Sequence, residues 1–436
     1  MRTQFSIAQL QDPDTNEVEK ILRKCVHCGF CNTTCPTFQL TGDELDGPRG
    51  RIYLLKDMLE NQTRPSSKVV SHIDRCLSCL SCTTTCPSGV DYMHLIDHGR
   101  SYIEQNHKRD FFDGLRRRAL LYLLPKPSRF RILMKISKLL APAKSLLPNS
   151  LQAGLKLASN TRIFEDITKK KTIFPTQNKK IGSVALLPGC TQQVLDDNIN
   201  AASIRLLNKS GYDVQILNKI ECCGAIELHL GKSSLAEDRI KSNLNKLTST
   251  LSEFDAIISN ASGCGTMLKD YAHLLRADTK YSDAGSRVSK KTMDICEFLE
   301  LHNFNPDPKI VNKTRVAYQS PCSMQHGQKV SHQAPALLKR FGFTLVDFPE
   351  NHLCCGSAGT YNILQAPLAE SLGQRKSDNI DSSEADVVAS GNMGCMLQLR
   401  QYSTLPFAHT VELLDWACGG PTPPDLKNNE ALSQNR

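Results

Sequence analysis

The stretches KCVHCGFCNTTCP (residues 24–36) and RCLSCLSCTTTCP (residues 75–87) carry one and the same cysteine pattern. Both read C-x2-C-x2-C-x3-C-P, the spacing with which bacterial ferredoxins bind [4Fe–4S] clusters. Three closely spaced cysteines wrap around one iron–sulfur cube, and in two-cluster ferredoxins the fourth cysteine ligates the other cluster. The pattern therefore predicts two clusters with exchanged ligands: Cys25, Cys28, Cys31 and Cys86 for the first, and Cys76, Cys79, Cys82 and Cys35 for the second.

A pair of structural zinc sites is the alternative for these eight cysteines. Zinc sites usually collect their ligands as two separated pairs, not as three cysteines followed by C-P. The iron–sulfur interpretation is therefore favoured. His27, inside the first loop, is expected to be a neighbour of the cluster or a surface residue and not a ligand.

The segment between the two loops, GDELDGPRGRIYLLKDMLE (residues 42–60), predicts a turn followed by a helix. Glycine and proline at positions 47–50 favour the turn, and apolar residues at positions 52, 55 and 59 have helical spacing. We expect this helix to pack against the cluster loops. Arg49 and Arg51 are then candidates for stabilising the more negative reduced cluster, with a plain surface role as the alternative.

A second repeat occupies the C-terminal half. Three pairs of short cysteine motifs recur there at an offset of 131 or 132 residues: VALLPGC and VAYQSPC, ECCG and LCCG, ASGCG and NMGCM. A constant offset indicates tandem copies of one domain. Each copy has four cysteines: Cys190, Cys222, Cys223 and Cys264 in the first, and Cys322, Cys354, Cys355 and Cys395 in the second.

The residues around these motifs predict α/β domains. Short apolar runs precede the cysteines, and helical stretches such as residues 196–210 and 236–251 follow them. This alternation is typical of βαβ units with parallel strands, whose ligands collect at the carboxyl ends of the strands. The four thiols of a copy are thus expected to converge on one crevice, as ligands of a possible third iron–sulfur cluster or as packed free thiols. Cys296 and Cys418 belong to no pattern and are expected to be structural.

Length and composition limit the remaining possibilities. At 436 residues the chain is expected to form two or three domains. The sequence has no secretory pattern at residues 1–20 and no apolar run that would span a membrane, which predicts a cytoplasmic protein with reduced thiols. Residues 105–175 hold sixteen Lys or Arg against four Asp or Glu, so the net charge of +9 is concentrated there. Prolines divide this basic segment into amphipathic pieces, which predicts docking to an anionic membrane surface or a partner, or a solvated connector.

The CCG motifs resemble the cysteine-rich domains of heterodisulfide reductase, of the third subunit of glycerol-3-phosphate dehydrogenase and of glycolate oxidase. Together with the doubled ferredoxin pattern and CVHCGFCNTTCPTFQLTGDELDGPRGRIYLLK (residues 25–56), the chain resembles the iron–sulfur subunits of glycolate oxidase over residues 1–420. One departure concerns the fullest cysteine-rich motif, which ends in C-x2-C. Ala261 and Asn392 stand where its first closing cysteine would be, which weakens the expectation of a disulfide-cleaving site.

The resemblance implies an electron-transfer subunit of a glycolate dehydrogenase complex. Flavoprotein subunits would oxidise glycolate to glyoxylate, and this chain would pass electrons toward a membrane quinone. The sequence has no dinucleotide fingerprint and no P-loop, so FAD is expected only on partners, no catalytic residue is assigned and no independent substrate oxidation is expected. A lactate or glycerol-3-phosphate dehydrogenase subunit and a disulfide reductase are the alternatives. The location implied is the cytoplasm or, peripherally, the cytoplasmic face of the inner membrane, with no nucleic-acid partner.

The fold class predicted from these patterns is a mixed α+β and α/β multidomain chain. It comprises a helical ferredoxin-like domain with two [4Fe–4S] clusters, then a linker, then two tandem α/β cysteine-rich domains. The expected boundaries are 1–104 for the cluster domain, 105–178 for the basic helical linker, 179–305 and 306–418 for the cysteine-rich domains, and 419–436 for a polar tail.

Overall fold

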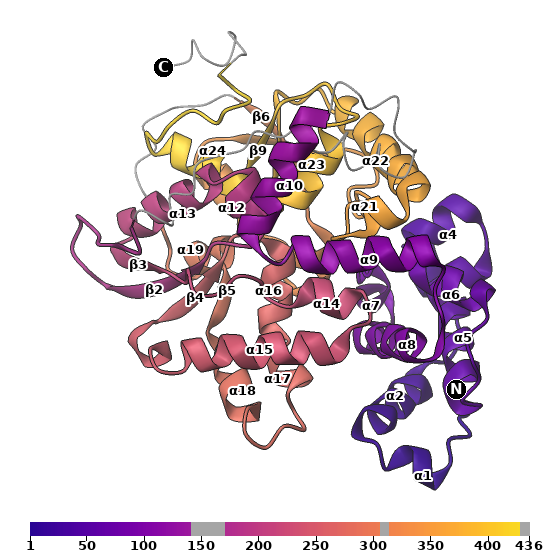
Figure 1. Ribbon diagram of the computed structural model, residues 1–436. Coiled ribbons are helices and arrows are strands. Elements are labelled where there is room, and N and C mark those ends of the chain that lie inside the picture. Colours follow the sequence, from indigo (N-terminus) through magenta and orange to yellow (C-terminus); the bar gives the residue numbers. More distant parts are fainter. Residues whose placement is uncertain (141–170, 306–313, 428–436) are drawn as a thin grey trace.

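The computed structural model describes residues 1–140, 171–305 and 314–427. A helical N-terminal domain packs beside two α/β domains, and two further helices run across their junction (Figure 1). The helical domain, the tandem α/β domains and the parallel strands agree with the fold class predicted from the sequence. No helix among these described residues is long and apolar enough to cross a membrane.

The N-terminal domain consists of short helices around the cysteine loops. Asp12 accepts a hydrogen bond from the Thr15 amide and caps helix α2, and a proline at the first helical position starts both α4 and α5. Leu22, Leu55 and Leu95 are fully buried in the small core between α2, α5 and α8. The elements are α1 (Ile7–Leu10), α2 (Pro13–Lys24), α3 (Phe30–Thr33), α4 (Pro36–Thr41), η1 (Glu44–Asp46), α5 (Pro48–Glu60), α6 (Ser67–Asp74), α7 (Ser81–Thr85) and α8 (Tyr92–Asn106).

The first cysteine-rich domain is built on a five-stranded sheet of order β1-β3-β2-β4-β5. All strand pairs are parallel except that of β1 with β3. The strands are β1 (Ile173–Phe174), β2 (Gly182–Leu187), β3 (Tyr212–Ile216), β4 (Ala256–Ser259) and β5 (Thr292–Asp294). The helical elements are α12 (Gln192–Leu195), α13 (Asn198–Lys209), α14 (Ala225–His229), α15 (Ser233–Leu247), η4 (Leu251–Glu253), α16 (Ser262–Lys269), α17 (Tyr271–Leu274), α18 (Ser282–Lys291) and α19 (Ile295–Leu301).

The second cysteine-rich domain repeats this arrangement. Its four strands are all parallel in the order β7-β6-β8-β9, which matches β3-β2-β4-β5 of the first domain. The sequence repeat is therefore a repeat of the fold. The strands are β6 (Arg315–Gln319), β7 (Thr344–Val346), β8 (Val387–Ser390) and β9 (Phe407–His409). The helices are η5 (Ser323–Gly327), α20 (Gln333–Arg340), α21 (Tyr361–Leu364), α22 (Ala366–Asp381), α23 (Met393–Leu399) and α24 (Thr410–Ala417).

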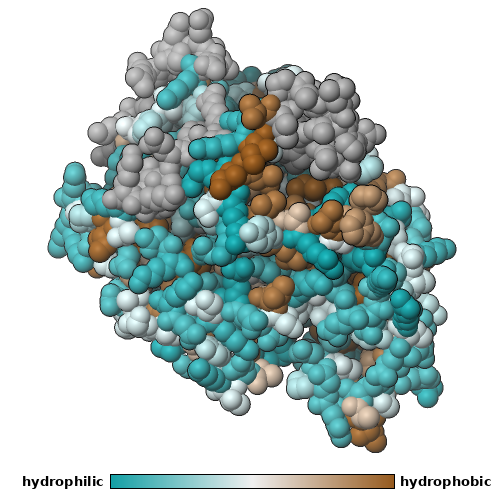
Figure 2. All heavy atoms as spheres, in the orientation of Figure 1, coloured by the Kyte–Doolittle hydropathy of each residue, from teal (hydrophilic) through white to brown (hydrophobic). Residues whose placement is uncertain are grey.

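Two helices, α9 (Phe111–Leu123) and α10 (Pro127–Leu140), form the described part of the basic segment. Pro127 begins α10, so the predicted division at proline occurs there. Leu120, Phe130 and Met134 are buried in the core that the cysteine-rich domains share. The other side of the two helices carries exposed apolar side chains, and Figure 2 shows apolar residues gathered over both helices. Its exposed side chains are Phe111, Phe112, Leu115, Tyr122, Ile132, Ile136 and Leu139. The rest of the predicted basic segment, 141–170, lies outside the described residues.

Candidate iron–sulfur sites

The first group of predicted ligands surrounds a hollow that opens to solvent. Its volume is about 430 Å³, counted with its opening, and Cys25, Cys28, Cys31 and Cys86 are among its lining residues. Cys28 is exposed, whereas Cys25 is buried. The loop bends around the hollow because His27 and Gly29 have φ angles of 58° and 84°.

The second group surrounds a hollow of about 300 Å³, lined by Cys35, Cys76, Cys79 and Cys82. Its loop bends in the same way, with φ angles of 49° at Ser78 and 63° at Leu80. Cys79 is half-buried and the other three thiols are buried. The structure thus brings together the groups that the sequence pattern proposed, with Cys86 in the first and Cys35 in the second.

The two hollows share a wall. Pro48, Cys82 and Tyr92 line both of them, and the Tyr92 hydroxyl lies 3.9 Å from the Cys76 sulfur. The hydroxyl oxygens of Thr34 and Thr85 lie 3.0 Å apart and join the loop ends. The two loops are therefore in contact, and each motif contributes one cysteine, Cys35 or Cys86, to the lining of the other motif's hollow.

The donor set suits iron–sulfur clusters. Burial, together with the neighbouring Cys25, raises the pKa of Cys31 to about 11, and burial raises the pKa of Cys82 well above its ordinary value. At neutral pH these two thiols are therefore protonated when no metal is bound, and they would release their protons on binding iron, as cluster ligands do. His27 lines the first hollow, and its Nε2 is buried with no hydrogen-bond partner among the residues that the structure describes.

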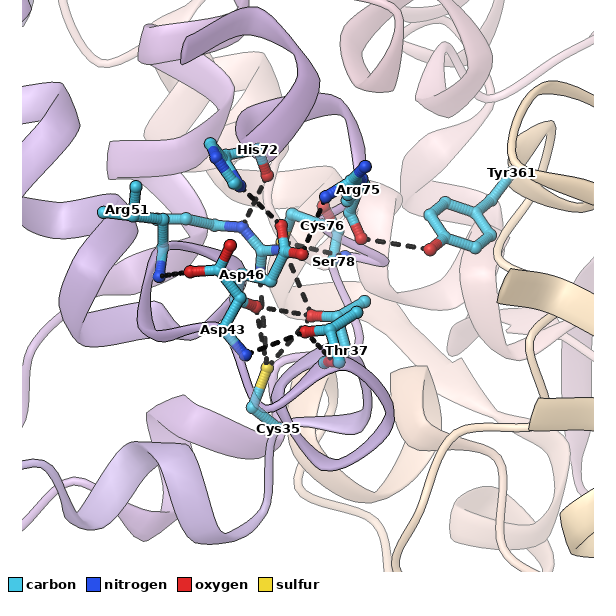
Figure 3. Close-up of polar contacts among 12 residues, drawn as sticks. Cys35, Thr37, Asp43, Asp46, Arg51, His72, Arg75, Cys76, Ser78 and Tyr361 are labelled. Atoms are coloured by element: carbon cyan, nitrogen blue, oxygen red, sulfur yellow. Dashed lines mark hydrogen bonds and ion pairs between the residues drawn. The ribbon is translucent and has the colours of Figure 1, made fainter. Parts of the chain in front are cut away.

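The two arginines of the intervening helix differ in their surroundings. Arg49 is partly exposed and forms an ion pair of 2.6 Å with Glu44. Arg51 is 1% exposed and lies among the residues of the second hollow (Figure 3). A plain surface role, which the sequence left open, is therefore wrong for Arg51. The turn and the packed helix at residues 47–60 are confirmed.

The four cysteines of the first cysteine-rich domain follow the carboxyl ends of its strands and meet. Cys190 interacts with Cys222, Cys222 with Cys223, and Cys223 with Cys264 through their side chains. Interaction with Cys222 and then burial raise the pKa of Cys190 well above its ordinary value. Asn243 donates a hydrogen bond of 2.8 Å to the Cys222 carbonyl and holds the CCG loop.

The second cysteine-rich domain gathers its four thiols beside a buried ammonium group. The Cys322 and Cys354 sulfurs lie 3.7 Å apart, and Cys355 interacts with both Cys354 and Cys395. Hydrogen bonds from the neighbouring thiols, Cys322 first, lower the pKa of Cys354 well below its ordinary value. Lys376 is 3% exposed and donates to the carbonyl groups of Asn351 and Leu353 at 2.8 and 2.6 Å.

This second thiol group lies against the second cluster loop. Cys79 and Leu77 of that loop pack in one apolar cluster with Cys322 and Cys354. The Tyr361 hydroxyl donates a hydrogen bond of 3.1 Å to the Arg75 carbonyl, next to Cys76 (Figure 3). Neither Lys376 nor this contact was predicted. The repeat did hold a signal for Lys376. The equivalent residue 132 positions earlier is the apolar Leu244, so a charged residue stands in the second domain at a position that is apolar in the first.

Comparison with known protein families agrees with this architecture. The model of a 4Fe-4S dicluster domain matches residues 21–90, and that of a cysteine-rich domain matches residues 184–269 and 316–400. The chain is thus an iron–sulfur protein that joins a dicluster domain to two cysteine-rich domains. The glycolate oxidase iron–sulfur subunit of Escherichia coli strain K12 is 38% identical over 96% of this chain and 99% of its own length. The chain belongs to the family of glycolate oxidase iron–sulfur subunits.

More distant relatives extend the comparison. A probable glycolate oxidase iron–sulfur subunit of Bacillus subtilis strain 168 is 29% identical over 92% of this chain and 93% of its own length. Lactate utilization protein A of Geobacillus thermodenitrificans is 25% identical over 50% of this chain and 89% of its own length. A crystal structure of a hypothetical protein from Helicobacter pylori has a TM-score of 0.54 at 11% identity, covering 96% of this chain and 75% of that one, and shows the fold alone.

Proposed function

We propose that this chain is the electron-transfer subunit of a complex that oxidises glycolate, and that it passes electrons from a flavoprotein partner toward a membrane quinone. The gathering of eight thiols around two hollows that share a wall carries the proposal. Clusters supply one-electron transfer when bound. The wall that the two hollows share supports electron transfer between the proposed centres. The exposed Cys28 supports access of a partner to the first of them.

The proposed ligand assignment is crosswise. Cys25, Cys28, Cys31 and Cys86 hold the first [4Fe–4S] cluster, and Cys76, Cys79, Cys82 and Cys35 hold the second. Anaerobic purification with iron and acid-labile sulfide counts tests it, alongside the variants Cys86→Ser and Cys35→Ser. Each variant is expected to lose the EPR signal of one centre and about half of the dicluster iron. Colourless, iron-free wild-type protein, or two intact centres in both variants, would refute the assignment.

A buried cysteine outside every motif provides the matched control. Cys296 is 2% exposed and its amide is held by the Asp294 carboxylate at 2.8 Å, away from the hollows. The variant Cys296→Ser is expected to keep the full iron content. Loss of iron in this control would show that the losses in the other variants arise from general instability.

Glycolate is the proposed substrate of the partner, and lactate is the second candidate because one group of relatives is named for lactate utilization. Co-purification of a flavoprotein, followed by anaerobic addition of each hydroxy acid, separates them. Glycolate is expected to bleach the cluster absorbance of the complex, and lactate is not. Bleaching by lactate alone would transfer the assignment to the second candidate.

A third cluster is proposed in the cysteine-rich half, at the thiols of the second domain. Its support is the lowered pKa of Cys354, the buried Lys376 and the proximity of Cys79. The wild-type protein is expected to hold well above eight iron atoms per chain. The Cys354→Ser variant is expected to lose the iron in excess of eight. Eight atoms or fewer in the wild type would leave these cysteines as packed thiols.

Peripheral membrane attachment through α9 and α10 is also proposed. Exposed apolar side chains lie there beside exposed basic ones such as Arg118 and Lys135. Flotation with vesicles containing anionic lipid tests it. Replacing Arg118 and Lys135 by Glu is expected to reduce binding severalfold, whereas Lys290→Glu on α18 leaves it unchanged. Equal binding of all three proteins would refute the attachment.

A further inference from the structure

The second site is more enclosed than the first, and this creates an electrostatic problem. Reduction by the partner's reduced flavin, one electron at a time, adds one negative charge at each centre. At the first site water reaches the exposed Cys28 and helps to solvate that charge. At the second site three of the four thiols are buried, and a charge taken out of water is strongly disfavoured.

We propose that Arg51 is the residue that sets the reduction potential of the second site, because its buried guanidinium replaces the missing water. The inference rests on the proposed function, since it requires that clusters occupy the two hollows. Arg51 is fully buried and lines the second hollow, and its Nη1 lies 4.0 Å from the sulfur of Cys35. A guanidinium stays protonated at any physiological pH, so this positive charge is permanent.

Hydrogen bonds fix the guanidinium in place (Figure 3). Nε donates to the His72 carbonyl at 2.7 Å, and Nη2 donates to the Thr37 hydroxyl at 3.1 Å. The Thr37 hydroxyl in turn donates to the Asp46 carbonyl at 2.6 Å and lies 3.3 Å from the Cys35 sulfur. The charge therefore cannot swing away from the site, unlike that of a surface arginine.

One carboxylate opposes Arg51 without cancelling it. Asp46 lies 3.8 Å from the guanidinium, but it also accepts an ion pair of 2.9 Å from Arg75 and pairs with the Nδ1 of His72 at 2.8 Å. The exposed Asp43 has a carboxylate oxygen within 4.8 Å of one on Asp46, so the two arginines face one buried carboxylate and one that water screens. A second buried arginine, Arg100 of α8, donates to the Cys76 carbonyl at 2.6 Å and has Asp97 as a partner at 3.7 Å.

The first site has no counterpart of Arg51 among the described residues. Its nearest arginine, Arg49, is partly exposed and paired with Glu44, so water and that carboxylate screen its charge. The amino group of Met1 donates to the Cys25 carbonyl from a half-buried position. A charge in the low-dielectric interior acts far more strongly than either of these.

An EPR-monitored redox titration of the anaerobic protein tests the inference, with dithionite and mediators as reductant. Arg51→Met is expected to shift one of the two reduction steps to lower potential and to leave the other in place. Arg51→Lys, which keeps the charge, is expected to restore much of the shift. Arg49→Met is the matched control and is expected to move either step far less.

A second variant acts in the opposite direction. Asp46→Asn removes the opposing charge but keeps a hydrogen-bond acceptor, and it is expected to shift the same step to higher potential. If the Arg51→Met variant loses iron, its titration cannot be interpreted, and the shift in the Asp46→Asn variant then tests the role of Arg51. Unmoved potentials in variants with full iron and sulfide content would overturn the role of Arg51. Wild-type protein without iron would instead overturn the proposed function.

Discussion

Loss of one histidine at the junction between the dicluster domain and the first cysteine-rich domain is expected to weaken that junction in a pH-dependent way. His94 of α8 pairs with Asp91 through Nδ1 at 2.7 Å and with Asp270 through Nε2 at 2.9 Å. His273 stacks on its ring at 3.4 Å. Burial lowers the pKa of His94, but the hydrogen bonds to the two carboxylates outweigh it and raise the pKa to about 10.

The pKa values of His94 and Asp270 are both raised, which favours the charged form of the histidine but disfavours the charged form of the carboxylate. Burial also raises the pKa of Asp270, which disfavours its charged form, while the hydrogen bond to His94 lowers it. Carboxylates on both ring nitrogens require both nitrogens to be donors, so the geometry favours a charged His94. Burial, and then the charge of His94, lower the pKa of the stacked His273 to about 4, which leaves that ring neutral at pH 7.

The magnitude follows from the shift. The pKa of His94 rises from 6.5 to about 10, and each unit corresponds to about 1.4 kcal/mol. Removing one member of a buried ion pair costs a similar amount, so His94→Gln is expected to lose roughly 3 to 5 kcal/mol at pH 7. Because the folded-state pKa lies above the unfolded value, this stabilisation is complete below pH 6.5 and disappears as the pH rises through about 10.

Native-state hydrogen exchange of α8 and α16–α17, corrected for the intrinsic rate at each pH, measures this difference. The gap between wild type and His94→Gln is expected to be large at pH 7 and to close near pH 10.5. His98→Gln, one turn along the same helix, is the matched control, because burial lowers the pKa of His98 and its ring carries no charge in this range. A gap of equal size at both pH values would show that His94 is neutral in the folded protein.

Three further substitutions test the packing around the sites. Leu55→Ala empties a fully buried position in the dicluster core and is expected to cost roughly 2 to 5 kcal/mol, measured as a lower urea midpoint with accelerated iron loss. Lys376→Met leaves two carbonyl groups without their hydrogen-bond donor, and each is expected to lower the free energy of unfolding by roughly 1 to 3 kcal/mol. Unfolding is followed through the fluorescence of Trp416, the single tryptophan. Gly50→Ala places a Cβ 2.1 Å from the Glu44 carbonyl and is expected to reduce iron per chain; wild-type values in any of these variants would contradict the corresponding contact.

The local patterns made most of the fold predictable. The repeated C-x2-C-x2-C-x3-C-P spacing, read as that of two-cluster ferredoxins, predicted the two groups of thiols that line the hollows. The offset of 132 residues likewise predicted two similar α/β domains, and their sheets are parallel apart from the pairing of β1 with β3. Both predictions depend on short-range spacing or on repetition, which a sequence displays directly.

Contacts between distant segments were not predictable in the same way. His94 and Asp270 are 176 residues apart and belong to no motif, so only the packing of α8 on the first cysteine-rich domain brings them together. Arg49 and Arg51 were equivalent candidates in the sequence. Their surroundings differ because Arg51 is buried and donates to the His72 carbonyl of α6, whereas Arg49 is partly exposed. The residue that replaces a fifth cysteine, Asn392, likewise gained a role only in three dimensions, where it donates to the Cys395 sulfur at 3.5 Å.

The wall formed by Pro48, Cys82 and Tyr92 has a consequence for how the protein matures. Under the proposed ligand assignment each loop supplies one thiol to the opposite centre, so neither centre is complete until both loops have adopted their final positions. Each centre is therefore expected to take up iron only after both loops have folded, whereas loss of a single shared thiol affects one centre alone. For the same reason the two motifs depend on each other in evolution, because deleting either would disable both.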